Sequence, residues 1–85
     1  MRRLLDIGNC VPDHSAITSL VTANFDAQVD QAHRLEDAAT LLGQHEYSLV
    51  LVNRLLDCDG SSGLDVIRSL KAEWPDVPIM MITNF

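Results

Sequence analysis

The chain has 85 residues, of which 47% are hydrophobic and 21% charged, and its formal net charge is −6. This composition is typical of one small globular domain and excludes a disordered chain or a coiled coil. Twelve acidic residues against six basic ones argue against a nucleic-acid partner, because phosphate contacts need clustered lysine and arginine. A domain this small buries only about 60 to 65% of its unfolded surface, so we expect marginal stability unless something covers its core.

No apolar run approaches the roughly 18 residues of a membrane span, and the amino terminus lacks the long apolar stretch of a signal peptide. We therefore expect a cytoplasmic protein without a membrane partner. The two cysteines, Cys10 and Cys58, have no metal-ligand spacing and no secretory context. Reduced thiols are expected, and a zinc site is not supported.

In the first half of the chain the hydrophobic period changes from extended to helical and back. Residues 2–9 form a short, mostly apolar segment, which predicts a strand. A helix is expected within 11–25, with Asp13 as its N-cap. Residues 27–33 form a brief extended candidate, and a second helix is expected over 34–46. The apolar stripes of the two helices comprise Ile17, Leu20 and Val21, and Leu35, Ala38, Leu41 and Leu42.

The second half continues the alternation. Residues 47–53 form a continuous apolar run, as expected of a strand buried on both faces of a parallel sheet. A third helix is predicted between Ser62, which can cap its start, and Pro75, which ends it. Its apolar positions are Leu64, Ile67, Leu70 and Trp74. Residues 77–85 then read as a final apolar strand.

The predicted order is therefore βαβαβαβ, the signature of a parallel α/β sheet with helices on its faces. Right-handed crossovers and a flavodoxin-like topology give the strand order 2-1-3-4. Ligands and chemistry in such sheets belong at the carboxyl ends of the first and third strands. Asn9, Cys10 and Asn53 are expected there together, with Thr83 nearby at the end of the fourth strand.

The stretch "LVLVNRLLDCDGSSGLDVIRSLKAEWPDVPIMMITNF" resembles the receiver domain of two-component response regulators, the CheY-like family. The resemblance extends more loosely through "PDHSAITSLV" and "AHRLEDAATLL". It implies a flavodoxin-like three-layer sandwich and a single receiver-like domain over 1–85. It also implies that this domain is incomplete at its carboxyl end, without the fifth strand and the last helices.

In that family an aspartate at the end of the third strand accepts a phosphoryl group from a histidine kinase. The resemblance places this position on Asn53, the acidic pair that helps hold Mg²⁺ on Asn9 and Cys10, and the switch Ser/Thr on Thr83. An amide is a poor nucleophile, and Mg²⁺ favours carboxylate oxygens. We therefore expect no phosphorylation at Asn53, no resident metal or other cofactor, and no enzymatic activity.

The expected function is that of a pseudo-receiver in a two-component or phosphorelay context, acting by protein interaction. Its expected partners are other signalling proteins, a histidine kinase or an output domain. The fourth strand would form an exposed apolar edge, and one sheet face would be short of a helix. The chain is thus expected to form a homodimer or oligomer through this strand and the bare face.

Several alternatives stay open. Asp57 or Asp59 could act as a displaced phosphoacceptor with Mg²⁺, although aspartate is common in such turns for backbone reasons alone. Asp6 interrupts an apolar strand, and it either faces solvent, is locally paired, or supplies a carboxylate near the site. A small-ligand-binding flavodoxin-like domain is a further alternative, for which the chain offers no phosphate-binding glycine motif.

The remaining titratable residues give no ligand set. "DCDGSSGLD" resembles the start of an EF-hand loop, but Ser62 and Arg68 occupy the places of its glycine and glutamate, so calcium binding is not expected. His14, His33 and His45 are scattered along the chain. They are predicted to be ordinary surface or core histidines.

Overall fold

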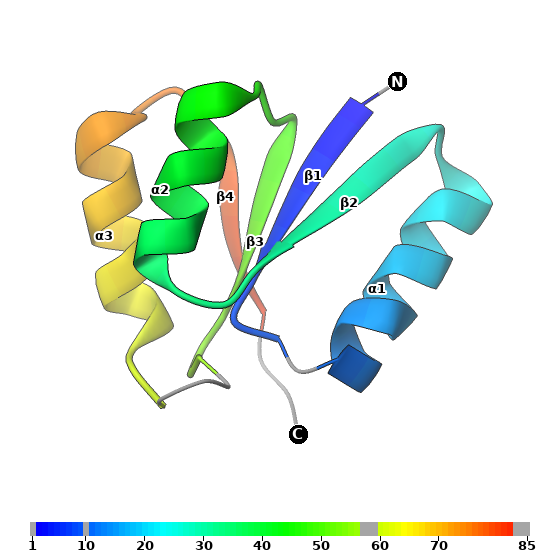
Figure 1. Ribbon diagram of the computed structural model, residues 1–85, viewed down its shortest axis with the longest axis horizontal. Helices are drawn as coiled ribbons and strands as arrows, with labels where there is room; N and C mark the ends of the chain where they lie inside the picture. Colours follow the sequence, from blue (N-terminus) through cyan, green and yellow to red (C-terminus); the bar gives the residue numbers. More distant parts are fainter. Residues whose placement is uncertain (1, 10, 57–59, 83–85) are drawn as a thin grey trace.

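The computed structural model describes residues 2–9, 11–56 and 60–82 of the chain. In this part, parallel strands form one sheet in the order β2-β1-β3-β4, with a helix in each connection (Figure 1). The elements are β1 (Arg2–Ile7), α1 (Val11–Asn24), β2 (Ala27–Ala32), α2 (Leu35–Gln44), β3 (Leu49–Asn53), α3 (Gly63–Glu73) and β4 (Ile79–Ile82). The predicted element order, the strand order 2-1-3-4 and the flavodoxin-like fold class are confirmed.

The core lies between the sheet and the pair α2 and α3, which lie together on one side of it (Figure 1). Alternate residues of the central strands β1 and β3 face this side, because successive side chains of a strand point to opposite faces. The buried core side chains are Leu5, Ile7, Ala32, Val50 and Val52 from the strands, Ala38, Leu42, Val66 and Leu70 from the helices, and Tyr47 and Leu56 from the segments that flank β3. The predicted apolar faces of α2 and α3 thus pack largely as expected, although Leu64 is 44% exposed.

The other face of the sheet carries α1 alone among the described helices (Figure 1). Ile17 and Val21 are half-buried against it, whereas Leu20 of the predicted stripe is 68% exposed. Leu20 is exposed because α1, the one described helix on this face, leaves the flank of its apolar stripe without a neighbour to pack against. Phe25, directly after the helix, is 61% exposed for the same reason.

The predicted start of α1 at Asp13 is also wrong. The helix already begins at Val11, so Asp13 lies inside its first turn. Pro12 is tolerated there because the first backbone N–H groups of a helix have no partner within it. The N-cap of α3 is Ser62, as predicted, with an extended backbone and no side-chain capping hydrogen bond.

β4 is the edge strand of the described sheet, paired with β3 from Val50↔Ile79 to Asn53↔Ile82. Its central residues Met80 and Met81 are 53% and 37% exposed. The predicted exposed apolar edge is therefore present in the described part of the chain. In that part, no helix combines the length and the apolar character that crossing a membrane requires.

Candidate functional site

The carboxyl ends of β1 and β3 meet at one edge of the sheet, since Ile7 and Val52 are paired in parallel register. Asn53, the last residue of β3, is buried, and its side-chain Nδ2 donates a hydrogen bond to the carbonyl of Gly8 at 3.3 Å. Asn9 follows and is fully buried. Asn9 and Asn53 thus reach the same edge of the sheet, where they were expected.

Two glycines allow the loops at this edge to close around Asn53. Gly8 has a positive φ of 82°, and a side chain there would overlap Leu56. A Cβ on Gly63, at the start of α3, would overlap the backbone carbonyl oxygen of Asn53. The N–H of Gly63 instead donates to the carbonyl of Arg54 at 2.7 Å, so the first turn of α3 lies directly against the end of β3.

Asp6 lies in β1, three residues before Asn9, and its side chain is fully buried. Its Oδ1 accepts a hydrogen bond from Nδ2 of Asn9, and its Oδ2 lies 2.7 Å from Nδ1 of His14. The solvent-facing alternative for Asp6 is therefore wrong, and local pairing is what the described structure contains. Both carboxylate oxygens are engaged, as burial of a charge requires.

His14 is the residue of this site that sequence reasoning missed. It lies in the first turn of α1, its side chain is only 18% exposed, and its Nε2 lies 3.4 Å from Oγ1 of Thr18. A histidine in the helical turn after a strand that contains an acidic residue was the available clue. A buried carboxylate in that strand needs a cationic or hydrogen-bonding partner from the element packed above it.

The oxygen donors at this edge are mostly amides. Oδ1 of Asn9 is buried and has no hydrogen-bond partner among the described residues. The backbone carbonyl of Asn9 accepts a hydrogen bond from Nε2 of Gln31 at 3.2 Å. The described residues contain no group of three or more histidine, cysteine, aspartate and glutamate side chains that could hold a metal ion. The site is thus a buried polar cluster whose one described carboxylate, that of Asp6, is already paired.

The other predicted site residues, Cys10, Asp57, Asp59 and Thr83, lie outside the described residues. Their roles as part of the acidic-pair position, displaced acceptors and switch residue stay predictions.

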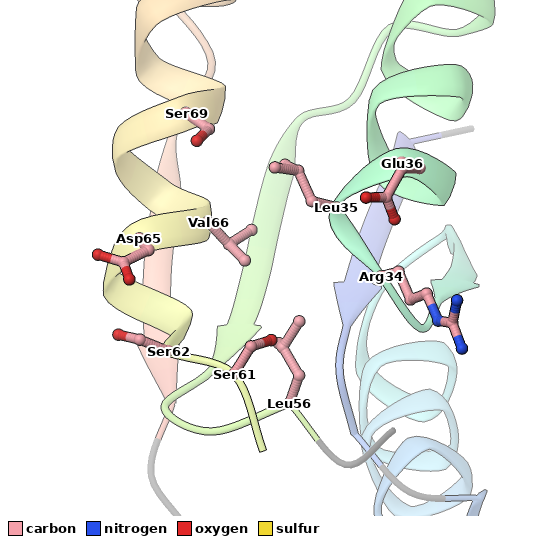
Figure 2. A pocket seen from close by; sticks show the side chains of 9 residues that line it. All are labelled: Arg34, Leu35, Glu36, Leu56, Ser61, Ser62, Asp65, Val66 and Ser69. Carbon is pink, nitrogen blue, oxygen red and sulfur yellow. The ribbon is translucent and has the colours of Figure 1, made fainter. Parts of the chain in front are cut away.

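A hollow of about 330 Å³ lies near this edge, between the first turns of α2 and α3. Figure 2 shows Leu35 and Val66 pointing toward one another across it, with Leu56 and Ser61 from the loop after β3 below them. Its charged residues are of both signs, Arg34 against Glu36 and Asp65. With one basic residue against two acidic ones, the hollow offers no cluster of cations that would bind an anion.

No protein-family model and no curated protein matches the sequence. Solved structures do match its fold. The response regulator TrrA of Thermotoga maritima, solved with Mg²⁺ and BeF, has a TM-score of 0.85 and 21% identity, over 100% of this chain and 71% of its own. A response regulator of Burkholderia pseudomallei, solved with a phosphorylated aspartic acid, a calcium ion and citrate, has a TM-score of 0.82 and 24% identity, over 100% and 48%.

A response regulator receiver protein of Pseudomonas putida matches with a TM-score of 0.83 and 19% identity, over 96% of this chain and 67% of its own. TrrA has also been solved in complex with the histidine kinase ThkA. At these identities the matches establish a shared fold. The residues that carry function have to be argued from this chain itself.

Proposed function

We propose that this chain, which has the fold of a response-regulator receiver domain, is a signalling module that works by protein interaction. We propose further that it is not phosphorylated at the usual position, which is Asn53. The observation that carries the proposal is the amide of Asn53 at the carboxyl end of β3, bonded to the backbone of Gly8. An amide lacks the nucleophilic oxygen that an acyl phosphate requires. The matched Burkholderia protein, by contrast, carries a phosphorylated aspartic acid.

The proposal includes a site without a resident Mg²⁺. TrrA was solved with Mg²⁺ and BeF, and Mg²⁺ is a hard cation that favours carboxylate oxygens. At this edge the described donors are the amides of Asn9 and Asn53, and the carboxylate of Asp6 is bound by Asn9 and His14. These donors do not fit a magnesium ion.

The proposed partners are other signalling proteins in the cytoplasm, a histidine kinase or an output domain. The complex of TrrA with the kinase ThkA supports this class of partner for the fold. The net charge of −6 favours a protein partner over nucleic acid.

A second copy of the chain is a further proposed partner, through β4 and the face that carries α1. The exposed side chains of Met80, Leu20 and Phe25 support it, being 53%, 68% and 61% exposed. Exposed apolar edges and patches of this kind mark association surfaces.

The test is incubation of the purified chain with acetyl phosphate and Mg²⁺, followed by intact mass measurement. We expect an unchanged mass, because neither Asn53 nor the paired Asp6 offers a free carboxylate. A stoichiometric gain of one phosphoryl group that hydroxylamine removes would overturn the proposal. Mapping of that group to Asp57 or Asp59 would establish the displaced-acceptor alternative instead.

A further inference from the structure

The contact between Asp6 and His14 continues to a third side chain. Nε2 of His14 lies 3.4 Å from Oγ1 of Thr18, four residues further along α1. Since Oδ2 of Asp6 lies 2.7 Å from Nδ1 of the same ring, the three side chains form a line of carboxylate, imidazole and hydroxyl. Two elements build this line, because Asp6 lies in β1 whereas His14 and Thr18 share one face of α1.

The contacts of Asp6 fix the tautomer of His14. An ionised carboxylate only accepts hydrogen bonds, so Nδ1 of His14 carries a proton and donates it to Oδ2. In the neutral imidazole Nε2 is then an acceptor, and the hydroxyl of Thr18 donates to it. Asp6 is fully buried and Asn9 holds its Oδ1, so the carboxylate stays in place. The imidazole is therefore oriented as a general base for the hydroxyl of Thr18.

The hydroxyl of Thr18 differs from those of other helical threonines in this chain. The hydroxyls of Thr22 and Thr40 each donate to the carbonyl four residues earlier in their helix, at 2.7 and 3.0 Å. The hydroxyl of Thr18 is instead bonded to the imidazole of His14. Its side chain is half-buried, so a reagent can reach it from solvent.

An apolar hollow of about 300 Å³ adjoins this line, on the face of the sheet that carries α1. One of its lining residues, Leu51, is paired with Asp6 in the register of β1 and β3. Another, Val21, lies about one helical turn after Thr18. The rest of its apolar lining consists of Leu4, Phe25, Ala27 and Leu49. Small-ligand sites enclose about 300 to 1,000 Å³, so the hollow has room for a short acyl chain.

We propose that Thr18 is a site of acyl modification, with His14 as its general base, Asp6 as the residue that positions His14, and the adjoining hollow as the pocket for the acyl chain. The donor class is an activated ester of a short apolar carboxylic acid. Oγ1 of Thr18 attacks the carbonyl carbon, its proton passes to Nε2 of His14, and the bond between that carbon and the leaving oxygen breaks. The products are a threonine ester and the leaving alcohol, which takes the proton back from Nε2.

The reaction is expected to be slow. The backbone N–H groups on either side of Thr18 bond along α1, so they do not stabilise the oxyanion that forms on the acyl carbon. A second copy on this face would cover the hollow, so association should slow the reaction further. The modification goes beyond the interaction module proposed above, and it does not depend on how Asn53 behaves.

The test is incubation of the purified chain, at a submicromolar concentration, with para-nitrophenyl butyrate. The readouts are nitrophenolate release, intact mass and peptide mapping of the acyl group. We expect one butyryl group on Thr18 for each nitrophenolate released. After correction for the rates in water, butyrate should react about tenfold faster than para-nitrophenyl acetate, because its longer chain buries more apolar surface in the hollow.

Variants separate the nucleophile from its base. Thr18→Val should abolish the ester, whereas Thr18→Ser should retain it. The matched control is Thr22→Val, because the Thr22 hydroxyl is exposed on the same helix and bonds to the carbonyl of Thr18. His14→Gln, with its fold checked by circular dichroism, should slow acylation by about a hundredfold or more. Asp6→Asn should slow it too, and should change the nitrogen NMR shifts that report the tautomer of His14.

Several results would overturn the proposal. They are butyryl groups on Lys71 or other nucleophiles with none on Thr18, an unchanged rate at Thr18 in folded His14→Gln, or equal corrected rates for butyrate and acetate. A butyryl group and a phosphoryl group differ in mass and come from different donors. The proposals for Thr18 and for Asn53 can therefore fail separately.

Discussion

The imidazole Nδ1 of His14 lies 2.7 Å from the buried carboxylate of Asp6, and this contact ties the first turn of α1 to β1. It is an interior contact, since Asp6 is fully buried and the His14 side chain is 18% exposed. Removing His14 would leave Oδ2 of Asp6 buried without its partner, while Asn9 would still hold Oδ1. Breaking a buried pair in this way costs more than the pair itself contributes.

The variant His14→Ala should therefore lower the free energy of unfolding by about 3 kcal/mol. The measurement is urea denaturation followed by circular dichroism. The control is the same substitution in an Asp6→Asn background, where no buried charge is left unpaired and the loss should be much smaller. An equal loss in both backgrounds would show that His14 contributes by packing alone.

The variant Asn53→Asp should not restore tight Mg²⁺ binding. It adds one carboxylate to the carboxyl edge, but the nearest described carboxylate, that of Asp6, is held by Asn9 and His14. Mg²⁺ titration followed by NMR is the measurement, with wild type as the reference. Tight binding in Asn53→Asp would mean that Asp6 leaves His14 and serves the metal.

Gly63→Ala should destabilise the chain by about 3 kcal/mol, because its Cβ would overlap the carbonyl oxygen of Asn53. Gly43 of α2 provides the matched control, since a Cβ there meets nothing within 4 Å. Gly43→Ala should stabilise the chain by up to about 1 kcal/mol through helix propensity. Thermal or urea unfolding of both variants tests this. Similar effects at the two positions would rule out the close approach at Gly63.

The hydroxyl of Tyr47 donates a hydrogen bond to Oδ2 of Asp30, and this contact makes the free energy of unfolding depend on pH. Burial raises the pKa of Asp30, but the hydrogen bonds from Tyr47 and Gln28 and the charge of Arg3 outweigh it, so the pKa lies below its usual value. Burial, together with the hydrogen bond to Asp30, raises the pKa of the Tyr47 phenol to about 12.

The lowered pKa of Asp30 contributes stability that is present above the usual aspartate pKa and is lost as pH falls through the folded-state value. The raised pKa of Tyr47, about 12, contributes stability that is present below the usual tyrosine pKa and is lost as pH rises toward 12.

Tyr47→Phe should abolish the loss of stability at alkaline pH and reduce the loss of stability at acidic pH. At neutral pH it should cost about 1.5 to 3 kcal/mol, the usual range for a hydrogen bond to a charged group. Urea midpoints measured across pH provide the comparison. An alkaline loss of stability identical to that of wild type would assign it to another group.

Sedimentation at micromolar concentration should show a dimer or larger assembly, and Met80→Lys on β4 should shift it toward monomer. A charge on an edge strand is a common way to block pairing with another chain. Leu64→Lys is the control, because Leu64 is 44% exposed on α3 and lies away from the proposed interface. A well-folded wild-type monomer would reject association through β4.

The alternating hydrophobic period was enough to predict the strands and the helices, because buried strands read as continuous apolar runs and helices show a longer repeat. The sheet order needed a further assumption, a flavodoxin-like topology with right-handed crossovers. It also placed Asn9 and Asn53 at one edge, since parallel strands end on the same side. The exposure of Leu20 could not be read this way. Helical periodicity shows which side chains share a face, whereas burial depends on what the rest of the fold places beside them.

The sequence alone was equally insufficient to predict the pairing of Asp6 with His14. An acidic residue in an apolar strand indicates that a partner is needed, but which side chain reaches it depends on where the next helix crosses the sheet. The start of α1 illustrates the same limit. Asp13 has the right chemistry for an N-cap, yet the chain was already helical from Val11.

The contact of Gly63 with the backbone of Asn53 has a mechanical consequence. With no side chain between them, and with the N–H of Gly63 bonded to the carbonyl of Arg54, the end of β3 and the start of α3 are in direct backbone contact. A partner protein that binds α3 and tilts it would displace Asn53 without any covalent change there. Under the proposed function, a partner bound on α3 would thereby act on the site around Asn53 through the backbone alone.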